Sequence, residues 1–435
     1  MQKRFALVDC NNFFVSCERL FNAELANKPV VVLSSNDACV IARSNEAKKL
    51  GIKMGDPVFK IKDLLKRNKV FIFSSNFTLY GDLSARVMSC LETLSTDIEV
   101  YSIDEAFMHL PFASGQISNS DQEQFYIDYA NHIRHTVKKN VGLPVSIGIG
   151  PTKTLAKVAN AIAKKLVTGP NIGVFDITNH PRIDEILATF PVEDVWGIGW
   201  AYKKKLAGKL IFNALELKNA DQRWVRKNMT VMGLKTVQEL NGTCCMELED
   251  IEPRDNICVS RAFGKNLSTL DELKVPLSCH ATRGCEKMRK QKSICNNVIM
   301  FFCYTSYQDP TIRLYKYASK QLLIPTNYTP TIISAAFECL DGIYKPGYIY
   351  KKIGIILGDL IPEESVQLST LSNISTAELD KQNKVIKSVD RINNKFGNNK
   401  ISFASNGTER SWNAKSEKRS PKYTTDWHEI LKIKI

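Results

Sequence analysis

Three carboxylates in the sequence are placed where they could do chemistry together. Asp104 and Glu105 stand side by side in VYSIDEAFMHL (100–110), between two apolar arms, and Asp9 lies near the end of the apolar run FALVDC (5–10). If the arms form a hairpin, the acids lie at its tip, and a strand ending beside that tip would bring Asp9 alongside. Three neighbouring carboxylates repel one another unless a cation neutralises them, and hard oxygen ligands suit Mg²⁺. Two such ions can clamp the attacking and leaving oxygens of a phosphoryl transfer.

A salt-bridged pair at a sheet edge is the alternative reading of these acids, because an Asp-Glu dipeptide alone is weak evidence. The segment 152–166 favours the metal reading, since it predicts a helix with one polar face and one apolar face. The polar face carries Lys153, Lys157, Asn160 and Lys164. This helix directly follows a GIGP turn, and helix N-termini attract phosphate. A merely solvated lysine face remains the alternative. Lys48, in the helix predicted after KPVVVLS, is a second phosphate candidate.

A third chemical signal is the turn Gly197-Ile198-Gly199, which lies between two predicted short helices and precedes Lys203 and Lys204. Glycines let the backbone approach a phosphate closely, and backbone amides can then hold DNA without reading its sequence. The pattern is typical of a helix-hairpin-helix element. An ordinary turn between helices is the alternative.

Composition limits the classes of partner. At 435 residues the chain is too long for one ordinary domain, and we expect three or four. Its net charge of +14 favours an anionic partner, with nucleic acid ahead of a membrane surface. No apolar run is long enough to cross a bilayer, and the N-terminal residues lack the apolar core of a signal peptide. We therefore expect a cytoplasmic protein with no membrane partner.

Twelve cysteines do not imply disulfides here. Most lie in apolar surroundings, where a free thiol packs as a small hydrophobe, and reduced thiols are usual in the cytosol. A zinc site is the alternative, built from Cys279, His280, Cys285 and Cys295. Their spacing lacks the paired short-range ligands that structural zinc prefers.

Strand-like and helix-like segments mix through the first 165 residues in the order expected of an α+β sheet domain. Residues 20–75 look like a smaller insertion, and 181–240 predicts short helices joined by turns. β-rich runs return from about 243 to 360, which suggests a second small sheet domain. After Pro362 the composition turns polar, and we expect the basic tail 361–435 to be partly extended.

Five motifs in order along the chain resemble those of Y-family DNA polymerases, and in particular the bacterial UmuC-type translesion branch. They are FALVDCNNFFVSCERLF, KPVVVLSSNDACVIARSNEAKKLGIKMGDPVFK, VYSIDEAF, SIGIGPTKTLAKVAN and VWGIGWAYKKKL. The likeness covers about the first 265 residues, and SPKYTTDW resembles the tail of that branch. The resemblance implies a low-fidelity, template-directed DNA polymerase that performs translesion synthesis in the SOS response to DNA damage.

The resemblance also implies roles for individual residues. Asp9, Asp104 and Glu105 would hold two Mg²⁺ ions, with the Cys10 carbonyl as an extra ligand. One ion would activate the primer 3′-hydroxyl, and the other would hold the incoming triphosphate. Phe14 stands where the family places its steric gate, an aromatic ring that excludes a ribose 2′-hydroxyl.

Further positions match those that contact the nucleotide or the DNA in the family. The nucleotide-binding set is Asn11, Asn12, Phe13, Phe14, Asn45, Lys48 and Lys157. The set that grips the DNA backbone is Gly197, Ile198, Gly199, Lys203 and Lys204. Simple core packing is the alternative for Phe13 and Phe14, and one of the two is expected to be core.

The sequence departs from the family pattern at three positions of the nucleotide site. Asn45 stands where many relatives carry a Tyr, Ala42 where they carry Thr or Ser, and Lys48 where an Arg is common. A lysine is a point charge without the bidentate fork of arginine, so we expect a weaker grip on the nucleotide rather than loss of activity. In the tail, QLSTL resembles a degenerate sliding-clamp-binding peptide, with Gln367, Leu368 and Leu371 as the contact residues.

The resemblance implies a right-hand α+β polymerase in several domains. These are a ferredoxin-like palm (1–20 and 75–167), small fingers (21–74), a helical thumb with the helix-hairpin-helix (168–240), an α/β little finger (243–360) and a C-terminal tail for partners or the clamp (361–435). The substrates would be primer-template DNA and deoxynucleoside triphosphates, and the protein partners a processed UmuD-type dimer, a RecA filament and the sliding clamp.

Two rival functions share part of this pattern. A nucleotide cyclase would use the same acids but would need neither the thumb turn nor the gate ring. A DNA-binding accessory protein would keep the fold with a weak or inactive site, and the three intact carboxylates argue against it.

Overall fold

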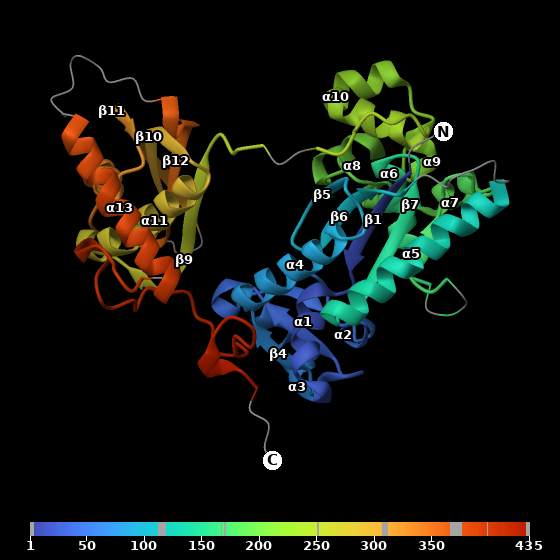
Figure 1. Ribbon diagram of the computed structural model, residues 1–435, viewed down its shortest axis with the longest axis horizontal. Helices are drawn as coiled ribbons and strands as arrows, with labels where there is room; N and C mark the ends of the chain where they lie inside the picture. The colour runs from blue at the N-terminus through green and yellow to red at the C-terminus, as the bar shows by residue number, and fades with distance from the viewer. Residues whose placement is uncertain are drawn as a thin grey trace. The chain divides into compact units, whose positions relative to one another are not determined.

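The computed structural model describes residues 4–111, 119–166, 168, 171–249, 252–306, 312–365, 376–397 and 399–431. The chain divides into two compact units, one of residues 1–34, 38–251 and 418–435, and the other of residues 35–37 and 252–417. Strands and helices mix in both units (Figure 1), which confirms the predicted α+β class. Among the described residues, none of the helices has both the length and the apolar character needed to cross a membrane.

A five-stranded sheet of order β5-β6-β1-β7-β8 forms the centre of the first unit. Its strands are β1 (Phe5–Cys10), β5 (Ile98–Val100), β6 (Glu105–His109), β7 (Val145–Gly150) and β8 (Val174–Asp176). All neighbouring strands are antiparallel except β7 and β8. The sheet therefore includes a strand beyond residue 167, although the thumb is predicted to begin at 168. The domain limits otherwise remain a prediction.

Helices pack on both faces of this sheet, and the alternation of side chains along β1 decides which residue meets which helix. The helices of this part are α1 (Phe13–Phe21), α4 (Phe77–Glu92), α5 (Asn119–Val141) and α6 (Lys153–Ala163). Ala6 and Val8 pack in one core with α4 and α5, whereas Phe5 and Leu7 pack on the opposite face with Ala156 of α6. Asp9 continues the second series, so its side chain belongs to the face that α6 covers.

The contact between α6 and β7 is too close for ordinary side chains. A Cβ added at Gly148 would meet backbone atoms of Asn160 and Ala156, so glycine is required there. The buried side chain of Asn160 donates to the carbonyl oxygens of Leu7 (3.2 Å) and Ser146 (2.9 Å). Helix α6 is thereby fixed against both β1 and β7.

A smaller sheet of order β3-β2-β4 forms within the predicted fingers. It comprises β2 (Val30–Leu33), β3 (Val40–Arg43) and β4 (Phe71–Ser74), accompanied by α2 (Asn45–Lys49) and α3 (Val58–Arg67). Val31 and Leu33 pack with Leu65 of α3 in a separate small core. This sheet has its own hydrophobic contacts, as expected of a small subdomain.

The segment after β8 is helical, as its turns predict. It contains α7 (Ile183–Thr189), α8 (Trp200–Ala207), α9 (Ala214–Lys218) and α10 (Gln222–Leu240). Leu206, Leu217 and Val225 contribute one buried residue each from α8, α9 and α10 to a shared core. Short 3₁₀ helices occur at Ala23–Leu25, Ser35–Asp37, Val192–Asp194, Glu363–Ser365, Ala404–Asn406 and Trp427–Glu429.

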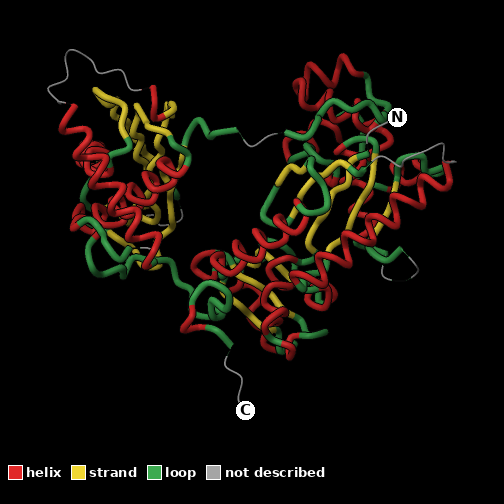
Figure 2. Tube along the Cα trace, in the orientation of Figure 1, coloured by secondary structure: helices red, strands yellow, loops and turns green. Residues whose placement is uncertain are grey.

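The second unit is an antiparallel sheet of order β11-β10-β12-β9 with helices on one face. It comprises β9 (Ile257–Leu267), β10 (Ser293–Ser306), β11 (Leu314–Thr326), β12 (Tyr348–Pro362), α11 (Leu270–Lys290), α12 (Thr329–Ile343) and α13 (Thr376–Phe396). Figure 2 shows these long strands beside their helices. The β-rich runs predicted for this region are therefore present.

The C-terminal tail contains the helix α13, which its polar composition does not predict, whereas residues 399–431 carry only two short 3₁₀ helices. Leu379, Ile386 and Val389 recur at helical spacing, and Ile386 is buried. Asp390 accepts from Arg289 of α11 at 2.6 Å. These contacts stabilise a helix whose exposed residues are so polar that composition alone suggests a loop. The predicted clamp residues Gln367, Leu368 and Leu371 lie outside the described residues.

Candidate active site

The acids Asp104 and Glu105 lie at the tip of a hairpin, as the sequence predicts. β5 and β6 pair antiparallel, with Val100 opposite Ala106. The turn between them is organised by Ser102, whose hydroxyl donates to Asp104 Oδ1 (2.7 Å) and accepts from the amides of Asp104 (3.2 Å) and Glu105 (3.1 Å). A serine at this position therefore presents both acids from one tight turn.

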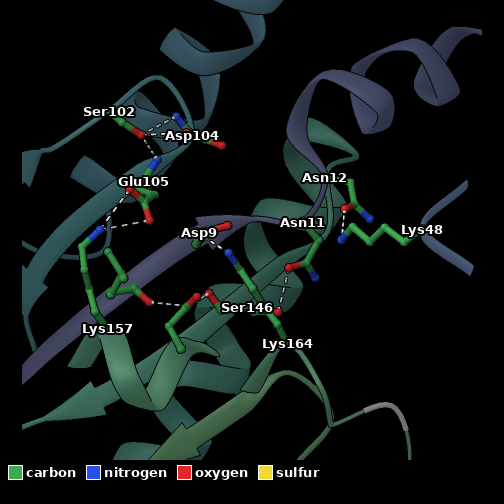
Figure 3. A network of polar contacts seen from close by, with 12 residues as sticks. Asp9, Asn11, Asn12, Lys48, Ser102, Asp104, Glu105, Ser146, Lys157 and Lys164 are labelled. Carbon is green, nitrogen blue, oxygen red and sulfur yellow. Dashed lines mark hydrogen bonds and ion pairs between the residues drawn. The ribbon is translucent and has the colours of Figure 1, made fainter. Parts of the chain in front are cut away.

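Asp9 joins this tip from the neighbouring strand. It lies opposite Glu105 in the register between β1 and β6, and the next amide, that of Cys10, donates to the carbonyl oxygen of Asp104 at 2.9 Å. Asp9 is thus held beside Asp104 and Glu105, almost a hundred positions further along the chain, at one end of the sheet (Figure 3).

Lysines of α6 and of its C-cap neutralise the carboxylates. Lys164 Nζ donates to Asp9 Oδ2 at 2.6 Å, and Lys157 Nζ lies 3.3 Å from both carboxylate oxygens of Glu105. Lys153, only 2% exposed, pairs with Glu99. The lysine face is therefore not a merely solvated one, because each of its lysines reaches an acid of the sheet.

The electrostatic setting of Asp9 reflects its burial and its two charged neighbours. Burial raises the pKa of Asp9 to about 7, the Lys164 ammonium opposes this rise, and the nearby Glu105 adds to it. A carboxylate in this setting needs positive charge to remain ionised at neutral pH. The site thus favours a cation next to Asp9.

The donor atoms suit a hard divalent cation, although they do not converge as they stand. Within the described ranges no three Asp, Glu, His or Cys side chains gather closely enough to hold a metal ion. The partners explain this spread, since Lys164 engages Asp9, Lys157 engages Glu105 and Ser102 engages Asp104. Carboxylate oxygens and a carbonyl are the ligand class that Mg²⁺ prefers, so the residues fit such an ion. The alternative zinc ligands, among them Cys279 and His280, form no such group either.

A pocket of about 420 Å³ opens beside the acids and has a cationic side. Asp9, Asp104 and Glu105 line it together with Phe14 and residues from the small sheet and its helix, which include Arg43 and Lys48. Nε of Arg43 is buried without a hydrogen-bond partner in the described part of the chain. Burial lowers the pKa of Lys48, and the positive charges of Arg43 and Lys164 lower it further. Arg43, Lys48 and Lys164 together match the three carboxylates in number, and Arg43 and Lys48, which form no ion pair within the described residues, would each be stabilised by an anionic ligand.

The structure gathers part of the predicted nucleotide set. Lys48 Nζ donates to Asn12 Oδ1 (2.7 Å) and Asn45 Oδ1 (3.2 Å), and Asn12 Nδ2 donates to Asn45 Oδ1 at 3.2 Å. Asn12 adopts a left-handed conformation (φ 47°), which asparagine tolerates better than most residues. These three side chains form one cluster at the pocket.

The other predicted nucleotide residues lie differently. Asn11 accepts from Ser146 Oγ at 2.8 Å and so faces β7. Phe13 is 3% exposed and belongs to the main core, whereas Phe14 is only partly buried. Both residues line the pocket, and Phe14 is the more exposed of the two. Lys157 lies 4.3 Å over the Tyr101 ring and outside the pocket lining.

Comparisons with known proteins match this architecture. Residues 8–161 match the impB/mucB/samB family, and 254–370 match the impB/mucB/samB family C-terminal domain. Protein UmuC of Salmonella typhimurium strain LT2 is 40% identical, over 99% of this chain and 100% of that protein, and Protein SamB of Salmonella typhimurium is 38% identical over the same shares. The chain belongs to the impB/mucB/samB family of UmuC-type Y-family polymerases.

More distant matches agree with this membership. DNA polymerase IV of Bacillus velezensis is 24% identical over 91% of each chain. A solved structure of a Y-family DNA polymerase chimera of Dbh and Dpo4 superposes with a TM-score of 0.62 at 21% identity, covering 82% of this chain and 99% of that one. The predicted Y-family polymerase fold is thus confirmed. Residues 383–433 match a domain of unknown function, DUF4113.

The sequence signals do not single out Arg43 or Ser102, and they place Lys164 on the lysine face without predicting its contact with Asp9. Lys164 contacts Asp9, Arg43 lines the pocket with an unpartnered Nε, and Ser102 organises the acidic turn. The helical spacing of 153–164 already places Lys164 on the face that carries Lys157, so that signal was present. The sequence holds no comparable signal for Arg43, which reaches the pocket only because β3 lies beside β2.

The thumb turn has the backbone that its glycines predict. Gly197 has φ 87°, a left-handed conformation, and Gly199 forms the N-cap of α8 without any side-chain cap. Ile198 is buried in the thumb core. Lys203 pairs with Glu193 at 2.8 Å, whereas Lys204 lies near the exposed ring of Trp200. The first amides of α8 are therefore available to a phosphate, in keeping with a role that remains a prediction.

Proposed function

We propose that this chain extends a primer by template-directed transfer of deoxynucleotides, with low fidelity and across damaged template bases. One observation carries the proposal: a single pocket holds the carboxylates of Asp9, Asp104 and Glu105, the cations Arg43 and Lys48, and an aromatic ring. A deoxynucleoside triphosphate needs all three kinds of group.

The acidic side of the pocket would hold two Mg²⁺ ions through Asp9, Asp104, Glu105 and the Cys10 carbonyl. When bound, such ions activate the primer 3′-hydroxyl and neutralise charge on the triphosphate. Lys48 and Arg43 would bind phosphate oxygens of the nucleotide, since both bring positive charge to a partly buried surface. On nucleotide binding, the Asn12 and Asn45 oxygens that now accept from Lys48 would be replaced in part by phosphate oxygens.

Phe14 would select the sugar. Its ring lies at the pocket beside Asn12 and is backed by other aromatic rings, so a ribose 2′-hydroxyl would meet a surface that cannot move away. The thumb turn at Gly197–Gly199 would hold the DNA backbone through amides, aided by Lys204. The small three-stranded sheet would enclose the nascent pair only loosely, which would favour tolerance of damaged bases.

The protein partners follow from family membership and rest on it alone. A processed UmuD-type dimer, a RecA filament and the sliding clamp would assemble with the chain during the SOS response, in the cytoplasm. Primer extension measured with and without each of these partners tests their contribution.

Primer extension on damaged and undamaged templates with Mg²⁺ tests the catalytic proposal. We expect extension by the wild-type chain and none by Asp104→Ala or Glu105→Ala. Asp97→Ala is the matched control, because Asp97 is an exposed acid on the same hairpin and its side chain binds His109 outside the pocket. Robust extension by the Asp104→Ala/Glu105→Ala double variant would refute the site.

The same assay separates the rival functions. A DNA-binding accessory protein would bind primer-template but extend nothing, and a nucleotide cyclase would release a cyclic nucleotide without any template. Replacing Phe14 with alanine should raise ribonucleotide incorporation, and unchanged sugar selection would remove the gate role.

A further inference from the structure

A short C-terminal segment runs alongside the elements that form the pocket. Residues 418–423, here called the C-terminal strap, belong to the first compact unit. The Lys418 amide donates to Ser74 Oγ (2.9 Å), and the Ser74 amide donates to the Lys418 carbonyl oxygen (3.0 Å). Tyr423 stacks on Phe21, the last residue of α1, at 4.5 Å between ring centroids. The strap thus contacts β4 and α1 at defined positions.

The strap completes a buried polar cluster around Glu18. Oε1 of Glu18, a residue only 2% exposed, accepts from Tyr80 Oη at 2.5 Å and from Ser420 Oγ at 3.0 Å. Burial raises the pKa of Glu18, and these two hydrogen bonds lower it. Tyr80 is fully buried, so its hydroxyl could not replace a lost hydrogen bond to Glu18 with one to water.

Asn76 connects the strap to the start of α4. Its Nδ2 donates to the Ser420 carbonyl oxygen (3.0 Å), to Ser420 Oγ (3.1 Å) and to the Pro421 carbonyl oxygen (3.1 Å). Its Oδ1 accepts from the Leu79 amide at 3.4 Å and caps the helix. One side chain therefore caps α4 and holds the strap, and the residue itself is 1% exposed.

Both sets of hydrogen bonds, through Glu18 and through Asn76, reach the part of α4 whose aromatic rings pack against Phe14. The Tyr80 ring, on α4, stacks against Phe14 with centroids 4.6 Å apart and planes within 17°. Phe77, in the first turn of the same helix, meets Phe14 edge-on at 5.8 Å. Phe14 and Glu18 lie four residues apart on α1, on neighbouring turns of one face. The strap therefore touches the support of Phe14 from two sides without touching the pocket.

We propose that Ser420 of the C-terminal strap is a positioning residue for the steric gate, acting through Glu18 and Tyr80. This inference rests on the proposed function, since it takes Phe14 as the residue that selects the sugar. Loss of the Ser420 hydroxyl leaves the buried Glu18 carboxylate with one hydrogen-bond donor instead of two. The carboxylate is then less constrained, and the Tyr80 hydroxyl that donates to it shifts with it. Because the Tyr80 ring is the surface on which Phe14 rests, the clearance for a 2′-hydroxyl changes. The segment in the domain of unknown function would thus take part in sugar selection.

Sugar selectivity tests the proposal. It is the ratio of kcat/KM for a deoxynucleotide to kcat/KM for the matching ribonucleotide, measured in Mg²⁺-dependent primer extension. Ser420→Ala and Tyr80→Phe should each lower this ratio about threefold to tenfold, the effect of one lost hydrogen bond. Ser420→Thr retains the hydroxyl and should keep the ratio at its wild-type value. Thr425→Ala removes an exposed hydroxyl from the same tail and should leave the ratio unchanged.

A double-mutant cycle separates positioning from mere stabilisation. If the strap acts through the gate, Ser420→Ala should lower selectivity no further once Phe14→Ala is present. A chain ending at Glu417 should behave as Ser420→Ala does. Selectivity unchanged in Ser420→Ala and in the shortened chain, with only the melting temperature lowered, would overturn the proposal, as would a fully additive loss in the double variant.

These outcomes also distinguish the inference from the proposed function. If Phe14→Ala itself leaves the ratio unchanged, the gate is refuted and this inference falls with it. If Phe14→Ala lowers the ratio and Ser420→Ala does not, the gate stands and only the strap is refuted. If the wild-type chain extends no primer at all, the proposed polymerase function has failed.

Discussion

At the scale of the residue, charge balance explains the site better than the acids alone. Asp9 is buried deeply enough to bring its pKa to about 7, and Lys164 is the ammonium that opposes this. Arg43 and Lys48 also bring positive charge to the pocket, and neither is ion-paired with an acid within the described residues. The acids of the site thus favour a cation and its basic residues favour an anion, and a metal-bound triphosphate supplies both.

Arg43 should matter for nucleotide binding, because its buried Nε has no partner in the described residues. We expect Arg43→Ala to raise KM for the incoming nucleotide about tenfold or more, the loss of a charge-assisted hydrogen bond, while kcat changes less. Steady-state single-nucleotide insertion measures both constants. Arg86→Ala is the control, since Arg86 is an exposed arginine on α4 paired with Asp82. An unchanged KM in Arg43→Ala would remove the residue from the nucleotide site.

His280 predicts an acid-sensitive second unit. Burial, together with the positive charge of Arg261, lowers the pKa of His280 to about 4. Since the unfolded chain takes up a proton near the ordinary pKa of 6.5, the stabilising contribution is fully present above that pH. It is lost as the pH falls from there towards 4, by up to about 3 kcal/mol.

Urea unfolding followed by tryptophan fluorescence measures this effect, because Trp412, whose ring centroid lies 5.6 Å from that of His280, is the one of the five tryptophans that belongs to the second unit. The free energy of unfolding of the wild type should fall between about pH 7 and about pH 5 more steeply than that of His280→Gln. The two proteins share every other titrating group, so equal slopes would contradict the buried neutral histidine.

Among the secondary-structure elements, α6 and its C-cap supply the lysines of the site. The N-terminus of α6 is anchored by Glu239, a residue distant in the sequence. Glu239 of α10 is fully buried, and its carboxylate accepts from the Thr154 amide (2.9 Å) and hydroxyl (2.8 Å) and from the amides of Cys245 (3.2 Å) and Met246 (3.1 Å). A buried carboxylate with four donors is favourable where one without donors would not be. The thumb thus helps orient the lysines that face the acids.

Replacement of Glu239 by glutamine should destabilise the first unit by about 2–3 kcal/mol, because the new NH₂ group would face backbone donors. Primer extension should weaken too, since α6 carries Lys157 and Lys164. Urea unfolding and extension rates measure the two effects. Glu193→Gln, at an exposed thumb residue, should leave the free energy of unfolding nearly unchanged. A stable, fully active Glu239→Gln protein would contradict the anchoring role.

At the scale of the whole molecule, the net charge of +14 is the relevant property. The positive excess suits a polyanion, and the family to which the chain belongs acts on DNA. Specific contacts aside, most of the affinity for a primer-template should come from phosphates that displace bound counterions.

Binding to a primer-template should therefore weaken steeply with salt. If six to ten phosphates are contacted, the affinity should fall about 10³–10⁵-fold between about 50 and 200 mM salt. Fluorescence anisotropy of labelled DNA measures the slope of log affinity against log salt. Lys204→Ala should reduce that slope by about one contact at most. An affinity independent of salt would contradict an interface dominated by phosphates.

Much of this organisation can be read from local patterns. The hairpin tip follows from two apolar arms around adjacent acids, and the lysine face of 153–164 follows from helical spacing, Lys164 included. The left-handed Gly197 follows from the glycines of the thumb turn. Helix α13 is missed because its apolar stripe is narrow, with Ile386 buried and Leu379 and Val389 only partly buried, and because its pairing with Arg289 depends on a helix far away in the chain.

The family and the candidate gate follow from the resemblance of five ordered motifs, and the acidic tip and the lysine face follow from residue type and from periods of two and about three and a half residues along the chain. Which charges meet depends on tertiary packing. The register of β1 against β6 places Asp9 opposite Glu105, α6 packs through Gly148 to bring Lys164 to Asp9, and the strap reaches Glu18 across 402 positions. Such contacts depend on how distant elements pack, and no local pattern encodes that.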